Sequence, residues 1–120
     1  MKRFLLGLVG GIILSGLALA AEKMASEKVV QPELITENQK VKITRIVLKP
    51  GEGSPLHTHA LDHIAVIVQG SSMRDVSTDG KTREMTEKTG EVVYVPGTGR
   101  THSFANSGTT PLEIVSIELK

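Results

Sequence analysis

Residues 51–63 read Gly-Glu-Gly-Ser-Pro-Leu-His-Thr-His-Ala-Leu-Asp-His and contain three of the four histidines of the chain. Because alternate residues of a strand point to the same face, His57 and His59 are expected to project together. The three residues that follow leave room for a tight turn, so His63 can open the returning strand and face this pair. The fourth histidine, His102, lies 39 residues further on, and a barrel can place its strand opposite. Imidazole is the commonest side-chain ligand of metal ions, so the four rings form a candidate site for one divalent ion.

Short strands separated by turns are expected in the rest of the chain. Val41–Leu48 alternates like a strand, whereas His63–Gln69 is apolar on both faces, as in a sandwich core or at a dimer interface. The pair Asp79-Gly80 is a strong hairpin signal, because both turn positions need positive φ. This spacing predicts an all-β sandwich or barrel without helices. The expected strands cover residues 41–48, 56–59, 63–69, 73–77, 82–88, 91–95, 101–106 and 112–119.

Composition limits what can stabilise this fold. The chain has 120 residues, no cysteine, no tryptophan, one tyrosine and two phenylalanines. A single domain, assigned to residues 41–120, is therefore expected to have a core of Val, Ile and Leu, which favour strands. Since no disulfide can form, stability must come from this core, from a metal ion or from oligomerisation.

Residues 1–20 have the layout of a secretory signal peptide. Lys2 and Arg3 give a positive start, residues 4–20 carry no charge, and Ala18-Leu19-Ala20 matches the A-x-A cleavage pattern. Cleavage after Ala20 would leave a periplasmic or secreted protein without a membrane segment. An uncleaved membrane anchor is the alternative, although 17 apolar residues are few for a span.

The 20 residues after the predicted cleavage site are charged and polar with little periodicity. Residues 21–40 are therefore expected to form a flexible arm, with a strand near Lys28–Gln31 or a short helical piece as the structured alternatives. Without Lys2 and Arg3, the remaining chain has 12 Lys+Arg and 13 Asp+Glu, a net charge of −1. A near-neutral domain without a basic cluster gives no reason to expect nucleic acid as a partner.

With these residues in view, the chain resembles the cupin superfamily over residues 41–119. The first cupin motif is commonly written G(X)5HXH(X)3,4E(X)6G. This chain has Gly51, five residues, His57-Thr58-His59, three residues, His63, six residues and Gly70. Every spacing fits, and the one departure is His63 in place of the usual glutamate.

The second cupin motif is commonly G(X)5PXG(X)2H(X)3N. This chain has Gly90, five residues, Pro96, two residues, Gly99, two residues, His102, three residues and Asn106. The one departure is an extra residue between Pro96 and Gly99, which raises the question of whether His102 still reaches the site. The two motifs together agree with the family pattern in about ten fixed positions.

The resemblance implies a double-stranded β-helix, or jelly roll, in which His57, His59, His63 and His102 bind one divalent metal ion. It also implies that Asn106 and the motif glycines are structural. Four neutral imidazoles offset none of the charge of the ion, which favours an anionic ligand and makes Fe, Ni, Cu, Zn or Co the expected metal. Protonation competes for each imidazole, so metal affinity is expected to fall below about pH 6.5.

Three functions remain open on the sequence. The first is a metal-dependent enzyme, an oxygenase, isomerase or lyase, that acts on a small polar or anionic molecule. The second is a non-catalytic module that binds or senses a metal or small ligand, and the third is a barrel that has lost its metal. No catalytic residue can be named, but Arg45, Tyr94, Arg100 and Thr101 are candidates to line the pocket.

A homodimer is expected, because the chain is short of core and similar small barrels often pair their sheets. The strand Ile64–Val68 and the C-terminal segment Leu112–Leu119 are the apolar candidates for that contact.

Overall fold

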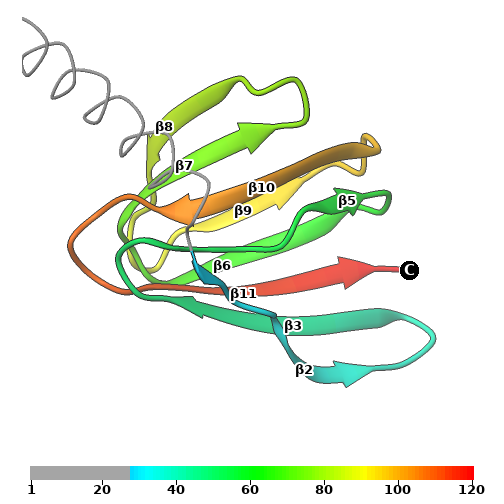
Figure 1. The fold of residues 1–120 in the computed structure, drawn as a ribbon. Coiled ribbons are helices and arrows are strands. Elements are labelled where there is room, and N and C mark those ends of the chain that lie inside the picture. The colour runs from blue at the N-terminus through cyan, green and yellow to red at the C-terminus, as the bar shows by residue number, and fades with distance from the viewer. Residues whose placement is uncertain (1–27) are drawn as a thin grey trace, which may run out of the picture.

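The computed structural model describes residues 28–120, which fold into two facing β-sheets (Figure 1). No helix occurs in this part of the chain, and thus none long and apolar enough to cross a membrane. The predicted signal peptide, residues 1–20, lies outside the described residues. The strands are β1 Lys28–Val29, β2 Glu33–Glu37, β3 Val41–Leu48, β4 Glu52–Gly53, β5 His57–His59, β6 His63–Gln69, β7 Ser72–Ser77, β8 Thr82–Thr86, β9 Val92–Val95, β10 Arg100–Asn106 and β11 Leu112–Leu119.

The strand order is that of a closed jelly roll. One sheet runs β1-β4-β10-β7-β8, with β5 also paired to β10, and the other runs β2-β3-β11-β6-β9. The all-β, double-stranded β-helix prediction is confirmed. The observed bounds of β3, β6 and β11 coincide with the predicted strands 41–48, 63–69 and 112–119, because their apolar alternation is long enough to identify them from sequence.

Residues 28–40 differ from the predicted flexible arm. β1 pairs in parallel with β4, and β2 pairs antiparallel with β3. Val30, just after β1, packs against the hydrophobic core. The strand considered near Lys28–Gln31 corresponds to β1, and the structured domain therefore begins well before residue 41.

The interior of the barrel has an apolar end and a polar end. In the five-stranded sheet, cross-strand register puts Leu48 beside Leu112 and Ile46 beside Ile114, and Ile67 flanks Ile114 on the other side. Four of these side chains are buried, and the fifth, Ile114, is partly buried. Ile46, Leu48, Leu112 and Ile114 form one core cluster with Met73, Met85 and Phe104 from the other sheet.

Further along the same strands, the inward positions become polar. Because side chains alternate between faces, the inner positions after Ile114 are Ser116 and Glu118 on β11, and their partners on β6 are Ala65 and His63. This end also holds β5 and the last residues of β11, which lie together at one end of the sheets (Figure 1). Leu119 donates its backbone N–H to the carbonyl of Asp62 just before β6, which ties the two segments together.

Asn106 stabilises the apolar end through its side chain, which is only 1% exposed. Its Oδ1 accepts hydrogen bonds from the Ser71 hydroxyl at 2.9 Å and the Gly108 N–H at 3.0 Å. Its Nδ2 donates to the carbonyls of Leu48 at 2.9 Å and Thr110 at 2.8 Å. All four hydrogen-bonding positions of the amide are therefore filled, which agrees with a structural role for this motif residue.

Asn106→Ala is expected to lower the free energy of unfolding by at least about 2 kcal/mol, since each buried polar group left without a partner costs about 1–3 kcal/mol. Urea denaturation followed by circular dichroism measures the loss. Gln69→Ala is the matched control, because the exposed Gln69 amide reaches only the neighbouring carbonyl of Gly70. Equal stability of the two variants would contradict a structural role for Asn106.

Candidate metal centre

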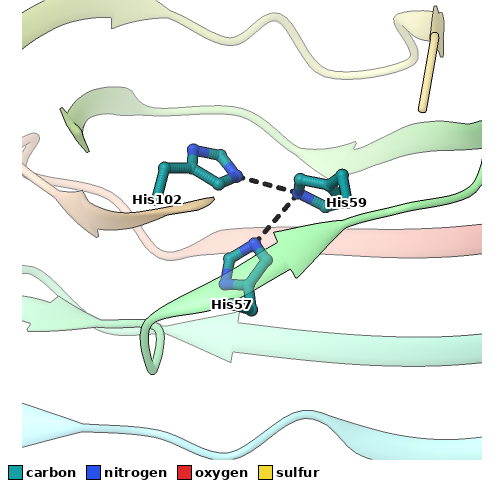
Figure 2. A group of neighbouring side chains, drawn as sticks. All are labelled: His57, His59 and His102. Atoms are coloured by element: carbon teal, nitrogen blue, oxygen red, sulfur yellow. Dashed lines mark hydrogen bonds between the residues drawn. The ribbon is translucent and has the colours of Figure 1, made fainter. Parts of the chain in front are cut away.

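Three of the four histidines converge at the polar end of the barrel (Figure 2). His57 and His59 lie on β5, and His102 lies on β10 directly opposite His57 in the antiparallel register. The Nε2 atom of His59 is 3.0 Å from Nε2 of His57 and 2.8 Å from Nε2 of His102. One ring nitrogen from each residue lies within 4.8 Å of the other two, a spacing that can hold a metal ion.

Neighbouring groups set the tautomers of two of these rings. The Nδ1 atom of His57 is 2.8 Å from the carbonyl oxygen of Pro55, and Nδ1 of His102 is 2.6 Å from Oδ1 of Asp75. Both oxygens can only accept, so both Nδ1 atoms carry the proton and both Nε2 atoms present a lone pair. Nε2 of His59 lies within hydrogen-bond distance of both lone pairs and can donate its proton to one of them in the metal-free protein. A cation between the three rings would take the place of that proton, and the residues present therefore fit a divalent metal ion.

Asp75 is a functional residue that the motifs did not identify. Its carboxylate is only 4% exposed, and its second oxygen accepts a hydrogen bond from Nη2 of Arg100 at 2.6 Å. Burial disfavours the charged form, but the hydrogen bonds from Arg100 and His102 outweigh it, so the pKa of Asp75 is lowered. A carboxylate behind a ligating imidazole fixes the ring and raises its basicity.

Burial also favours the neutral form of the His59 and His63 imidazoles. Desolvation, followed by the neighbouring histidines His63, His57 and His102, lowers the pKa of His59 to about 4. Desolvation likewise lowers the pKa of His63, against the opposing effect of Glu118. These rings are therefore in the form that binds metal at neutral pH.

The metal-free protein is expected to lose stability as the pH falls from about 6.5 toward 4. An unfolded histidine titrates near 6.5, whereas His59 titrates near 4 in the fold, so the unfolded chain binds more protons within this interval. Urea denaturation in the presence of a chelator, repeated across this pH range, measures the effect. His59→Gln should flatten the profile, and an identical slope in that variant would contradict this assignment.

His63 lies in the cluster without joining the group of three. It is 7% exposed, and its ring stacks on that of His59 with centroids 4.2 Å apart and planes 18° from parallel. Its Nδ1 atom is buried and has no hydrogen-bond partner within residues 28–120. Its cross-strand neighbour on β11 is Glu118, a second carboxylate that the sequence motifs did not indicate. Ligation by His63 stays a prediction.

Of the four residues that the sequence suggested as pocket lining, one lies at the histidine cluster and three lie outside it. Arg100 contacts Asp75, and its Nη2 also donates to the Ser77 hydroxyl at 2.7 Å. Thr101 instead points to the other face of β10, where its hydroxyl lies 2.6 Å from that of Thr58. The other two have partners away from the histidines: Arg45 pairs with Glu33, and the exposed Tyr94 donates to Asp62.

The extra residue between Pro96 and Gly99 leaves His102 in the cluster. Gly99 has a φ of +75°, a conformation that glycine tolerates best, and its N–H donates to the carbonyl of His59 at 2.9 Å. Gly97 packs so closely on the β5–β6 turn that a Cβ atom there would lie 2.6 Å from the carbonyl oxygen of Ala60. The loop is thus held directly against the strand that carries His57 and His59.

Comparison with known proteins agrees with this fold. The sequence profile of the cupin domain family matches residues 44–118. A cupin domain from Bordetella pertussis Tohama I has a TM-score of 0.67 at 25% identity, over 74% of this chain and 91% of that one. An RmlC-like cupin family protein with a double-stranded β-helix fold, from Methanocaldococcus jannaschii, has a TM-score of 0.58 at 25% identity, over 73% and 77%.

Curated relatives are much longer than the matched region. Mannose-1-phosphate guanylyltransferase of Escherichia coli K12 is 33% identical over 85 residues, which are 69% of this chain and 16% of that protein. A putative mannose-1-phosphate guanylyltransferase of Vibrio cholerae is 30% identical over 88 residues, 18% of its length. This chain therefore spans less than a fifth of the length of these relatives, and it belongs to the cupin domain family.

Proposed function

We propose that this chain is a metal-binding cupin that holds one divalent transition metal ion through the Nε2 atoms of His57, His59 and His102. The convergence of these three nitrogens carries the proposal, since two of them are fixed as lone-pair donors by Pro55 and Asp75. His63 is proposed as the fourth ligand, because its ring already stacks on His59 and its Nδ1 has no partner among the described residues.

The nature of the donors limits the metal and its ligand. Imidazole nitrogens suit Fe, Ni, Cu, Zn or Co better than Mg or Ca. Such an ion would supply Lewis acidity toward an oxygen of a bound molecule. The charges of Asp75 and Arg100 compensate each other next to the cluster, so the charge of the ion itself is left to attract an anionic small molecule.

Elemental analysis of the protein purified from its native compartment tests this proposal. About one equivalent of a transition metal per chain is expected. Metal-stripped protein should take up one equivalent on titration with Zn(II), Co(II) or Ni(II). Absence of bound metal together with no uptake of any of the three would refute the site.

A metal-dependent enzyme is the second candidate, and one observation favours it. Glu118 occupies an inward position beside the buried His63, which is where a general acid or base could reach a molecule at the cluster. Turnover on a panel of small hydroxy acids, diketones and thiols, assayed with each metal, separates the two functions. Activity that Glu118→Gln abolishes while metal content is retained would identify an oxygenase, isomerase or lyase, whereas tight metal uptake without turnover supports a binding or sensing module.

We also infer that two copies pair through the outer face of the β2-β3-β11-β6-β9 sheet. The inward residues of this sheet form the core and the polar end of the barrel. The outward residues of β6 and β11 are apolar except Glu113, and Val68 on this face is 44% exposed. The same face carries Arg45 and Glu113, whose opposite charges can pair across a two-fold axis. The remaining outward positions on these two strands are Ile64, Val66, Val115, Ile117 and Leu119.

Ile117→Glu is expected to shift the protein from dimer to monomer, because a charge would be buried at the centre of the apolar contact. Sedimentation velocity at micromolar concentration measures the change. Thr58→Glu, on the outer face of β5 in the other sheet, is the control and should stay dimeric. A monomeric wild type would refute the dimer.

Export remains a proposal that rests on residues 1–20 alone. The positive start, the apolar stretch and the A-x-A pattern support delivery to the periplasm or the medium. The N-terminal sequence of the protein recovered from cells tests it. Ala21 as the first residue is expected, and an intact Met1 on membrane-bound material would overturn it.

A further inference from the structure

A cavity beside the histidine cluster is lined by several positively charged side chains. Its volume is about 350 Å³, and it is lined by Asp75, Ser77, Lys81, Thr82, Arg83 and Arg100. Pockets for small molecules have volumes of about 300–1,000 Å³. A larger cavity of about 450 Å³ lies at the other end of the barrel, but no lysine, arginine or histidine lines it. The smaller cavity is therefore the one next to the histidine cluster.

The single carboxylate of this cavity is already neutralised. One oxygen of Asp75 accepts from His102 and the other accepts from Arg100, both at 2.6 Å. The negative charge of Asp75 is therefore already offset by Arg100. Its cross-strand partner on β8 is Arg83, and no ion pair joins the two.

Arg83 is a further cation in the lining of this cavity. Its Nη2 lies 3.1 Å from the thioether sulfur of Met85, a weak acceptor, and it forms no salt bridge to a carboxylate within residues 28–120. Lys81, at the turn between β7 and β8, is only loosely paired with Asp79 at 3.9 Å in an exposed ion pair. An arginine fork without a carboxylate partner, next to a lysine, is suited to a planar or tetrahedral oxyanion.

We propose that this cavity binds the oxyanion group, a carboxylate or a phosphate, of the small molecule that the histidine cluster receives. Arg83 binds the group, Lys81 adds positive charge, and Thr82 forms part of the cavity wall. The link to the histidine cluster rests on the proposed metal-binding function, whereas binding of the oxyanion itself depends only on this cavity.

The fold brings the two sites within reach of one molecule. Ser77, which lines the cavity, is the cross-strand partner of His102, and Asp75 forms part of the wall while it holds the His102 ring. Arg83 lies on β8 and His102 on β10, and these strands flank β7 on either side, so their backbones are about 10 Å apart. A compact molecule with an oxyanion at one end and oxygen ligands at the other can therefore span the cavity and the cluster.

Titration of metal-free, full-length protein with inorganic phosphate, and separately with succinate, tests the proposal by NMR. Saturable binding in the millimolar range or tighter is expected, with chemical-shift changes at residues 75–83 and at Arg100. Arg83→Gln should weaken it about tenfold or more, because a charge-assisted pair is removed. Arg74→Gln is the matched control, since it removes the same charge from the outer face of β7, where Arg74 pairs with Glu84.

The outcomes separate the two proposals. Preference for phosphate over succinate would identify a phosphorylated ligand, and the reverse preference a carboxylic acid, and both support the subsite. No saturable binding, or equal losses in Arg83→Gln and Arg74→Gln, would overturn it. Oxyanion binding in a protein that takes up no metal would instead refute the metal site and leave the cavity intact.

Discussion

The double variant His57→Ala/His102→Ala is expected to lose its metal ion. Two of the three converging nitrogens are removed, one from β5 and one from β10, and the imidazoles of His59 and His63 that remain hold a divalent ion far more weakly against water. Mutation of a residue that only supports a metal ligand lowers affinity by up to about 100-fold. The loss in affinity of this double variant should be larger, because ligands themselves are removed. Competition with a chromophoric chelator measures the affinity of wild type and variant for Zn(II).

The matched control for this variant is Thr58→Ala/Thr101→Ala. Both threonines lie on the same two strands as the histidines, and their hydroxyls, 2.6 Å apart, join those strands on the outer face. The control therefore disturbs the same β5–β10 pairing without touching a proposed ligand. Full metal uptake by the control and none by the histidine variant is the expected pattern. Retention of one tight equivalent in the histidine variant would contradict the site.

The convergence of His57, His59 and His102 was predictable because each step is local. Alternation on a strand places two rings on one face, and the fixed spacing after Gly90 places the third ring at the start of another strand. The structure puts His102 directly opposite His57 in the β5–β10 register. The jelly roll itself followed from the same motifs together with the long apolar strands.

The parts that sequence reasoning missed depend on long-range pairing. Asp75 reaches His102 only because β7 lies beside β10, and nothing near residue 75 in the sequence indicates that register. Its position inside the strand Ser72–Ser77 was the available signal, since a carboxylate on the same face as Met73 must find a partner when buried. The strand β1 is two residues long and exposed, so no periodicity could indicate its pairing with β4.

Asp75→Asn is expected to weaken metal binding by about 10- to 100-fold while the shape of the side chain is preserved. In the wild-type protein, the carboxylate accepts the Nδ1–H of His102, which orients the ring and makes its Nε2 a stronger donor to a metal ion. An amide is uncharged and leaves Arg100 without its anion, so the imidazole loses basicity and the guanidinium next to it is uncompensated. Both effects disfavour a cation at the cluster.

A purely structural role for Asp75 would reduce stability without changing the metal site, and two measurements separate the alternatives. The visible spectrum of the Co(II)-loaded protein reports the donor strength of the imidazoles and should shift in Asp75→Asn. Asp79→Asn, at the tip of the same β7–β8 hairpin, removes an exposed carboxylate of equal charge and should leave both affinity and spectrum unchanged. If Asp75→Asn lowered the unfolding midpoint but kept the wild-type affinity and spectrum, Asp75 would be a support of the fold alone. A loss of affinity with an altered spectrum instead shows that the carboxylate acts on the metal through His102.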